Sequence, residues 1–282
     1  MLNKKIRVVT DSTSDLPPEY VKENNINVIP LYVNFPDATY RDGVDMAPAE
    51  FYPLLKSAKD FIPKTSTPTR EDFTQVYKSL LEEGYEVISI HISSGLSSTF
   101  SIAKAAAQTL SDRIHVFDSK SISLGIGLQV METVDMIKQD LHLSEIADYL
   151  HKLRHRTEVL FSIDTLEYLQ KGGRIGKVSS LLGSILNIKP VIRVEDGIYV
   201  PLDKVRNQKQ AIKRKVEHMA KVLDGLRPRY VGVAHGAAEE AAHCLKELAE
   251  STFDIKVSIL QEASPVIGVH AGPGCLGLSF TY

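Results

Sequence analysis

The chain has 282 residues, of which 33 are Lys or Arg and 35 are Asp or Glu, so its net charge is close to zero. This balance argues against a broad nucleic-acid-binding surface, and no apolar run reaches the length of a membrane span. Residues 1–5 lead into a strand-like run rather than a signal-type apolar segment, and Cys244 and Cys275 have neither metal-ligand spacing nor a disulfide framework. We therefore expect a cytoplasmic protein with two domains or one large one.

Strand-like and helix-like segments alternate through the first half of the chain. The expected strands are residues 6–10, 28–35, 87–92 and 114–117. The expected helices are residues 17–25, a segment after Pro48, a segment from Pro68 to Glu83, and residues 98–110, 124–137 and 144–154. This rhythm predicts a mostly parallel sheet with helices on both faces.

The second half has a different pattern. Residues 191–200 carry Asp196-Gly197 at their centre, which is the turn signal of a β-hairpin. Further strands are expected at 159–163, 230–234 and 256–260, with helices around 212–223 and at 237–251. Because residues 152–158 are charged, we expect an N-terminal α/β domain over 1–155 and a C-terminal α/β domain with a mixed sheet over 156–282. The cleft between them is a favoured place for a ligand.

Polar loops follow several of the expected strands. Asp11–Asp15 comes directly after the first strand, where ligands bind in open α/β sheets, although the same residues also suit a turn and a helix cap. Lys64–Thr69 places hydroxyls before a helix, which favours an anion site, and capping accounts for only Thr67 or Thr69. Ser93–Thr99 repeats this design without the glycine spacing of a nucleophile elbow, so a cap with a hydroxyl-lined anion site is expected.

Two glycine-rich segments add charged or titratable side chains. In Lys171–Ile175, Gly172 and Gly173 would let Arg174 reach a carboxylate or phosphate, or they would simply end a helix. His270 is expected where a strand over 266–269 gives way to a glycine-proline-glycine turn, a placement that suits an oxyanion donor or proton transfer. Cys275 is interpreted as a packing residue, and Arg206 as part of a solvated helix start.

In this order and spacing, the motifs identify the chain as similar to the DegV family of bacterial fatty-acid-binding proteins, which includes the acyl-carrying component of fatty acid kinase. The matching motifs are Val9–Thr13, Lys64–Pro68, Ser94–Ser97, Lys171–Arg174, Lys204–Arg206 and His270–Gly274. They are spread over essentially the whole length. Ala271 and Ser98 depart from the family pattern, where threonine and glycine are common, without removing a proposed ligand.

The resemblance implies a long-chain fatty acid in an apolar tunnel between two α/β domains. Its carboxylate would be held by Thr65 with Ser66 as a helper, by Ser94 with Ser93 and Ser97 as further candidates, and by Arg174 and His270. Arg174 and His270 would also act in phosphotransfer. No cofactor is implied. An ATP-dependent fatty acid kinase protein would phosphorylate the carboxylate for phospholipid synthesis, with transient contact at a membrane surface, because this chain has no phosphate-binding glycine loop or metal cluster of its own.

Two other functions remain open at this point. Ser94 or Ser97 with His270 and Asp11 would make a serine hydrolase or acyl transferase, provided that the three groups lie within hydrogen-bond reach. The hydroxyl-rich loops would also suit a sugar- or phosphate-binding module, which requires a short polar pocket in place of an apolar tunnel.

Overall fold

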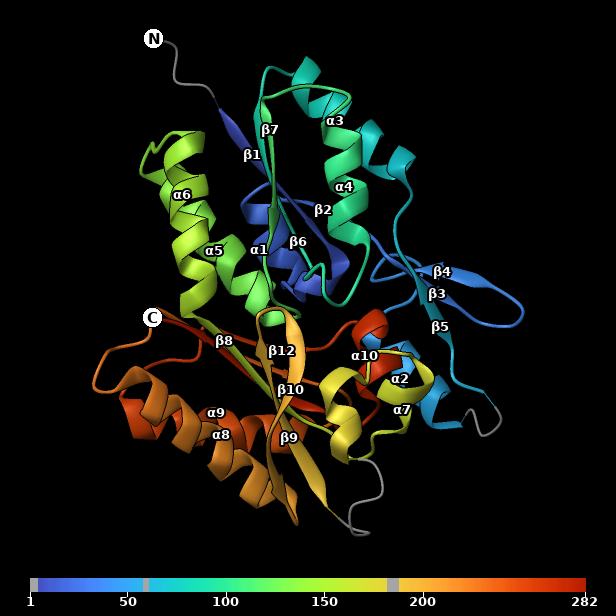
Figure 1. Cartoon of the computed structure of the whole chain (residues 1–282), viewed down its shortest axis with the longest axis vertical. Helices are drawn as coiled ribbons and strands as arrows, with labels where there is room; N and C mark the ends of the chain where they lie inside the picture. Colours follow the sequence, from blue (N-terminus) through green and yellow to red (C-terminus); the bar gives the residue numbers. More distant parts are fainter. Residues whose placement is uncertain (1–4, 58–60, 182–187) are drawn as a thin grey trace.

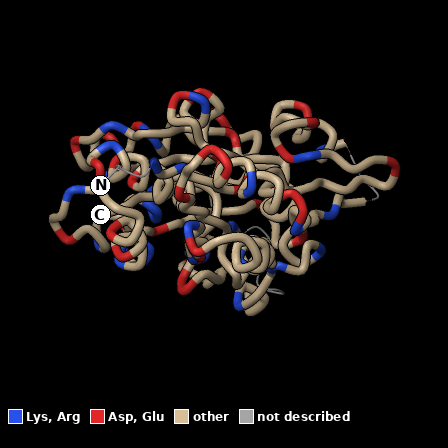
Figure 2. Tube along the Cα trace, turned by 90° about the horizontal axis from the view of Figure 1, so that it is seen from above, with Lys and Arg blue, Asp and Glu red and all other residues tan. Residues whose placement is uncertain are grey.

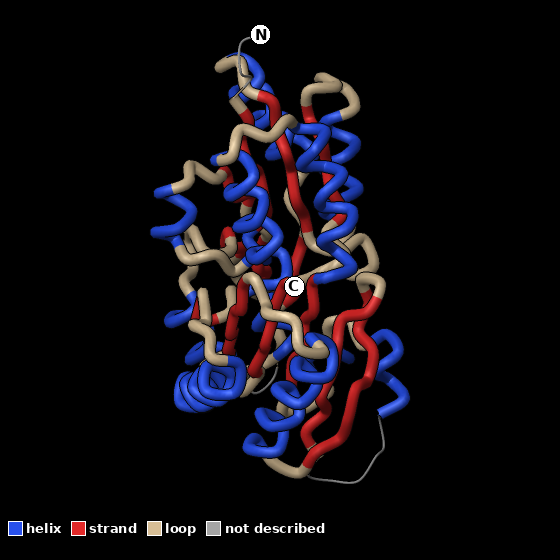
Figure 3. The backbone as a smooth tube through the Cα atoms, turned by 90° about the vertical axis from the view of Figure 1, so that its left-hand side faces the viewer, coloured by secondary structure: helices blue, strands red, loops and turns tan. Residues whose placement is uncertain are grey.

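The computed structural model describes residues 5–57, 61–181 and 188–282, and is an α/β protein with two main sheets (Figure 1). The tube in Figure 3 shows the strands of each sheet flanked by helices. Residues 1–4, part of the segment on which the sequence-based expectation about a signal rests, lie outside the described residues. No helix in the described part of the chain is long and apolar enough to cross a membrane. Basic and acidic residues are interspersed along the trace in Figure 2.

The first sheet is entirely parallel, as the alternation of strands and helices predicts. Its order is β2-β1-β6-β7. The strands are β1 (Ile6–Asp11), β2 (Asn27–Ile29), β6 (Glu86–His91) and β7 (Ile114–Asp118), and the helices around them are α1 (Pro18–Glu23), α3 (Arg70–Glu82), α4 (Thr99–Ala107), α5 (Leu124–Lys138) and α6 (Leu143–Leu153). Helices α3 and α4 lie on one side and α5 and α6 on the other (Figure 1). Because both faces are covered, the two central strands, β1 and β6, are mostly buried.

The second sheet is mixed, which also agrees with the sequence. Its order is β10-β9-β8-β13-β11-β12, with only the β11–β12 pair parallel. The strands are β8 (Thr157–Ser162), β9 (Lys189–Glu195), β10 (Ile198–Val205), β11 (Tyr230–His235), β12 (Ile259–Glu262) and β13 (Leu276–Thr281). Helices α8 (Gln208–Leu223) and α9 (Glu239–Phe253) pack on one face. The hairpin turn between β9 and β10 is confirmed, with positive φ at both Asp196 and Gly197.

The strand expected over residues 28–35 is wrong in its extent. Its beginning is β2 of the parallel sheet, whereas its end is β3 (Tyr32–Asn34) of a separate three-stranded sheet. Pro30 lies between the two and has no N–H to donate to a strand ladder, which explains the break. The small sheet has the order β4-β3-β5, from β4 (Thr39–Arg41) and β5 (Lys64–Ser66), so part of the expected Lys64–Thr69 loop is a strand.

The strand expected over residues 266–269 is also wrong, because this segment is helix α10 (Pro265–Ala271). Proline at the first helical position is favourable, since its fixed φ suits a helix and its missing N–H has no intrahelical partner there. Gly272, with φ 75°, ends the helix. His270 therefore lies in the last turn of a helix, and the glycine-proline-glycine turn follows it.

Helix α10 joins parts of the chain that are far apart in sequence. It packs against α2 (Pro48–Ser57) in a cluster that also includes Leu31 and Val33 of the small-sheet region. Helix α7 (Glu167–Lys171) also lies beside α10 (Figure 1). A segment from the first third of the chain is thus packed beside the second sheet. The proposed division at residues 155 and 156 stays a prediction; it falls within the short 3₁₀ segment Arg154–Arg156 that precedes β8.

Candidate functional site

A cavity lies between the two main sheets and α10. About 80 Å³ of it is open to the centre of a water-sized sphere, and the total space between its wall atoms, including solvent at the open mouth, is about 840 Å³. Most of its wall is apolar, and representative wall residues are Leu31, Ile92, Leu96, Val159, Phe161 and Ile267. Four of the six proposed ligand-binding residues also line it: Thr65, Ser97, Arg174 and His270. These four come from β5, the loop after β6, the segment after α7, and α10, so the fold brings together residues that are up to 205 positions apart.

Thr65 and His270 are in direct contact. The Oγ1 atom of Thr65 lies 2.8 Å from Nε2 of His270. The contact joins β5 to the last turn of α10, so it fixes the imidazole at the cavity wall. The Nδ1 atom of His270 is buried and has no hydrogen-bond partner among the described residues. This ring is therefore held at one nitrogen and left unsatisfied at the other.

The protonation state of His270 follows from its surroundings. Burial, and secondarily the positive charge of Arg174, lowers the pKa of His270 to about 4. The imidazole is consequently neutral near pH 7, with one nitrogen as a donor and the other as an acceptor. A neutral ring can orient a hydroxyl or donate one hydrogen bond to an anion, but it contributes no positive charge.

The positive charge of the site comes from Arg174. Its Nη1 donates to the carbonyl of Gly172 over 2.7 Å, and its Nε lies 3.4 Å from the carbonyl of Leu96. Within the described ranges, Nη2 has no partner and the guanidinium forms no ion pair. Gly172 also ends α7, so helix capping and placement of Arg174 occur in the same turn. The backbone carbonyls hold the guanidinium at Nη1 and Nε, and Nη2 is left as a donor for a carboxylate or phosphate.

Gly172 is required by the close packing against His270. A Cβ atom built on Gly172 would lie 2.2 Å from Nδ1 of the imidazole. Gly173, which follows it, has φ 71° and nothing within 4 Å of a built Cβ. The two glycines therefore have different purposes: the first makes room for His270, and the second permits the turn that leads to Arg174.

The serine candidates separate into different environments. Ser97 lines the cavity, and its hydroxyl lies 2.8 Å from Thr99 Oγ1. Ser94 is exposed, donates to Asp118 over 2.5 Å and accepts from Lys120 over 2.9 Å, and it is not among the residues that line the cavity. Ser93 is buried against the carbonyl of Gly197. Ser66 is exposed and accepts from Asn34 over 3.2 Å.

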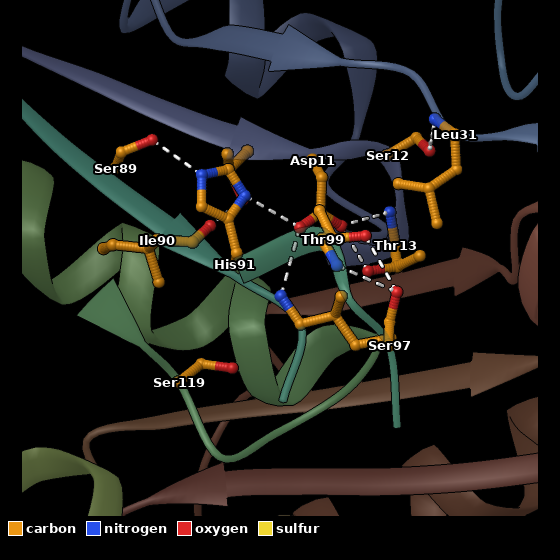
Figure 4. Close-up of polar contacts among 12 residues, drawn as sticks. Asp11, Ser12, Thr13, Leu31, Ser89, Ile90, His91, Ser97, Thr99 and Ser119 are labelled. Atoms are coloured by element: carbon orange, nitrogen blue, oxygen red, sulfur yellow. Dashed lines mark hydrogen bonds and ion pairs between the residues drawn. The ribbon is translucent and has the colours of Figure 1, made fainter. Parts of the chain in front are cut away.

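Asp11 belongs to a separate, buried network (Figure 4). Its carboxylate accepts from the backbone N–H groups of Thr13 and Ile92 and lies 2.9 Å from Nδ1 of His91. The other ring nitrogen of His91 lies 2.7 Å from Ser89, which in turn contacts the hydroxyl of Tyr77 at 2.8 Å. Asp11, His91, Ser89 and Tyr77 are all fully buried, so this network stabilises the fold without facing the cavity.

The hydrolase arrangement requires Ser94 or Ser97, His270 and Asp11 to form a connected set. Instead, Asp11 contacts His91, while Ser94 contacts Asp118 and His270 contacts Thr65. Burial raises the pKa of the Cys275 thiol to about 12, so that group is not an activated nucleophile either. The three groups of the proposed hydrolase therefore have separate partners, while the cavity offers hydrogen-bond donors for an anion.

Two aromatic residues of the cavity wall were not predicted from the sequence. Phe161 of β8 and Tyr199 of β10 form an edge-to-face pair with ring centroids 5.1 Å apart. Val159 and Phe161 point to the same side of β8, so strand alternation could have identified Phe161 as inward-facing. Nothing in the local sequence of β10 indicates that Tyr199 packs across the site.

Comparison with known proteins identifies the family. The model described as an uncharacterised protein of the DegV family matches residues 5–282. The chain belongs to the DegV family. Among curated relatives, a DegV domain-containing protein of Clostridium acetobutylicum is 39% identical over 279 residues, and one of Staphylococcus aureus strain MRSA252 is 38% identical over 271 residues. These alignments cover 98% and 96% of this chain, respectively, and the same shares of the relatives.

Solved DegV-family structures share the whole fold. A fatty-acid-binding DegV family protein from Thermus thermophilus matches with a TM-score of 0.93 at 34% identity, covering 99% of this chain and 100% of that one. A stearic acid-binding protein from Eubacterium ventriosum matches with a TM-score of 0.92 at 30% identity, covering 99% and 98%. DegV from Bacillus subtilis, described as a fatty acid binding protein, matches with a TM-score of 0.89 at 32% identity, covering 99% of each chain.

Proposed function

We propose that this chain binds one long-chain fatty acid, with the acyl chain in the apolar cavity and the carboxylate beside Thr65, Arg174 and His270. The observation that carries the proposal is the composition of one cavity, in which hydrogen-bond donors gather around His270 and most of the remaining wall is apolar. Ser97 lies on the same wall and adds a hydroxyl. Ser66 and Ser94, which were proposed from the resemblance, lie at the surface and are less suited to a first contact with the ligand.

The energetics of such a ligand agree with this cavity. An ionised carboxylate buried without donors costs several kcal/mol, and Nη2 of Arg174 and the hydroxyl of Thr65 can offset that cost. Each methylene removed from water contributes roughly 0.8 kcal/mol. A long acyl chain therefore supplies most of the affinity, and the polar cluster sets its orientation. The fatty-acid-binding relatives from Thermus thermophilus and Eubacterium ventriosum support this choice of ligand.

Lipid extraction tests the ligand directly. The purified protein, extracted with organic solvent and examined by mass spectrometry, is expected to yield about one fatty acid per chain. After delipidation, the protein should bind added palmitate or oleate as a 1:1 complex in native mass spectrometry. Failure to bind any long-chain fatty acid after delipidation, with the fold intact by circular dichroism, would remove the proposal.

We further propose that the chain is not a catalyst alone but presents the carboxylate to an ATP-dependent kinase in the cytoplasm, which forms acyl phosphate for phospholipid synthesis. The partly unpaired guanidinium of Arg174 suits this role, because it can stabilise charge on a phosphoryl group during transfer. In the described part of the chain no cluster of His, Cys, Asp and Glu is suited to a metal ion, so the partner would bring both ATP and metal.

Arg174→Ala tests the presentation role separately from binding. The variant is expected to bind the fatty acid more weakly but still to retain it, because the acyl chain supplies most of the affinity and Thr65, Ser97 and His270 remain beside the carboxylate. It is expected to lose formation of acyl phosphate when the kinase and ATP are added. Arg227→Ala is the matched control, because Arg227 is exposed before β11, lies outside the cavity lining and belongs to none of the family motifs. Full turnover by Arg174→Ala would exclude its role in transfer while leaving the binding function standing.

A further inference from the structure

The N-terminus of α10 is held by carboxyl groups from the opposite end of the chain. Asp15 Oδ1 accepts from the backbone N–H of Ser264 over 3.0 Å, and Asp42 Oδ1 accepts from that of Val266 over 3.1 Å. Ser264, the N-cap residue, makes no capping bond with its own side chain. Two N–H groups at the start of α10 are therefore capped by side chains that lie 249 and 224 positions earlier in the chain. Such caps usually come from a residue next to the helix.

Helix α10 is a wall of the proposed fatty-acid site. Val266, Ile267 and His270 all line the cavity, so the helix runs along it from the carboxyl pair to the imidazole. Ser123, a further cavity residue, donates from its hydroxyl to Asp15 Oδ2 over 2.5 Å. Ser123 has φ 53° at the start of α5, an unusual backbone conformation for a residue with a side chain. Displacement of the carboxyl pair would therefore move groups on two sides of the cavity.

The pair is buried without a counter-ion. Asp15 is 5% and Asp42 is 2% exposed, and neither forms an ion pair within residues 5–57, 61–181 and 188–282. The Oδ2 atom of Asp42 and the hydroxyl of Ser264 are buried with no hydrogen-bond partner among those residues. Both line a second, more open cavity beside α1 and α2. The hydroxyls of Ser12 and Ser264 nevertheless lie near the Asp42 carboxyl, and a proton on Oδ2 would let this oxygen donate a hydrogen bond to one of them.

Burial raises the pKa of Asp15 to about 6 and that of Asp42 to about 7, against the lowering effect of the hydrogen bonds that the two carboxyls accept. Repulsion from neighbouring acids is a smaller contribution in the same direction as burial. The ionisable groups that surround the pair are Asp11 on β1, Tyr52 on α2, Glu262 on β12 and Cys275 before β13. The charged residues that line the second cavity farther out are Arg7, Lys22, Glu83 and Glu262.

We propose that Asp15 and Asp42 are positioning residues of the ligand site: they form a carboxyl latch that holds α10 against the cavity while one of them is protonated and loosens it when both are ionised. The proposal rests on the proposed function, since it concerns the wall of the same cavity. Neither carboxyl touches the ligand. Their effect passes through α10 to His270, and through Ser123 to the start of α5.

The direction of the pH dependence follows from linkage. In the closed latch the carboxyls bind protons more tightly than in an opened, hydrated state, where their pKa values return to the ordinary range. Raising the pH from 6 to 8 therefore removes protons from the closed state and favours opening. For a single group with a pKa of about 7 in the closed state, the population of the open state rises about tenfold over this interval.

The test measures release of a fluorescent polyene fatty acid from the full chain by stopped flow, after mixing with excess oleate at pH 6, 7 and 8. Wild type is expected to release the probe about tenfold faster at pH 8 than at pH 6. His270 does not titrate in this interval, because its pKa lies near 4. A change of less than about twofold in wild type would overturn the latch.

Variants of Asp42 separate titration from structure. Asp42→Asn keeps an acceptor for Val266 and places a permanent donor where Oδ2 lies, so this variant should release the probe slowly. Its release rate should change no more than about twofold between pH 6 and 8, because only Asp15 still titrates. Asp42→Ala removes the acceptor and should release rapidly at every pH. Asp37→Asn, an exposed acid in the turn between β3 and β4, is the matched control and should behave as wild type.

Titration of the fatty acid itself affects the release rates of wild type and Asp42→Asn equally. The ratio of the two release rates at each pH is therefore independent of it. A pH step that persists in Asp42→Asn, or slow release from Asp42→Ala at pH 6, would overturn the latch. These failures differ from failure of the proposed function, in which the delipidated wild type binds no fatty acid at any pH.

Discussion

Two histidines in this protein each contact a hydroxyl group, yet their surroundings differ. His91 lies between Asp11 and Ser89, with both ring nitrogens hydrogen-bonded and the whole side chain buried. His270 contacts Thr65 through one nitrogen, leaves the other unsatisfied, and lines a cavity beside an arginine that forms no ion pair among the described residues. Buried polar groups in folded proteins are normally paired, so incomplete pairing at a cavity indicates a place for a ligand. The better-formed network is thus the structural one.

The largest expected effect is on stability, in the His91 network. Asp11→Ala leaves the imidazole of His91 and the N–H groups of Thr13 and Ile92 without their acceptor. Each buried donor left without its acceptor costs about 1–3 kcal/mol, so the variant is expected to lose about 3 kcal/mol or more. Urea unfolding followed by circular dichroism should show this loss, whereas His270→Ala should change the free energy of unfolding by less than about 1 kcal/mol. Equal losses in the two variants would remove the distinction between the networks.

The next effect concerns ligand affinity, in the His270 region. Thr65→Val and His270→Ala each remove one half of the 2.8 Å contact, and each is expected to weaken binding of oleate by about tenfold, the equivalent of one hydrogen bond. Isothermal titration of delipidated protein measures the change. Because the two residues act through the same contact, the double variant should lose much less than the product of the single losses. Independent, multiplicative losses would show that the two side chains hold the ligand separately.

The adjacent glycines give a smaller and more local test. Gly172→Ala places a Cβ 2.2 Å from the present position of His270 Nδ1, so the imidazole must move and oleate binding should weaken severalfold. Gly173→Ala strains a residue with φ 71° but meets no atom within 4 Å. It is the control for backbone strain and should lower stability slightly with little change in affinity. The reverse pattern would mean that the turn, and not the space beside His270, matters for binding.

The sequence predicted the two sheets well because each strand has a local signature. The central parallel strands are rich in Val and Ile, and the β9–β10 hairpin has an Asp-Gly turn. The prediction was wrong at residues 266–269, where a short apolar run fits either a strand or a helix, and the packing of α10 against α2 decides between them. Contacts such as Asp42 with Val266 join residues 224 positions apart and have no local signature at all.

The same limit applies to the serine loop, where the sequence alone left Ser93, Ser94 and Ser97 as alternatives. They are hydroxyls of one short loop, and their spacing does not indicate which one faces the cavity. Ser97 lines the cavity, whereas Ser94 already uses its hydroxyl to bond Asp118 and Lys120. Ser97→Ala is therefore expected to weaken oleate binding about threefold, with Ser94→Ala within error of wild type in the same titration. Weaker binding by Ser94→Ala than by Ser97→Ala would mean that the ligand carboxylate lies nearer the Asp118 edge of the loop, farther from His270 than its contacts with Thr65 imply.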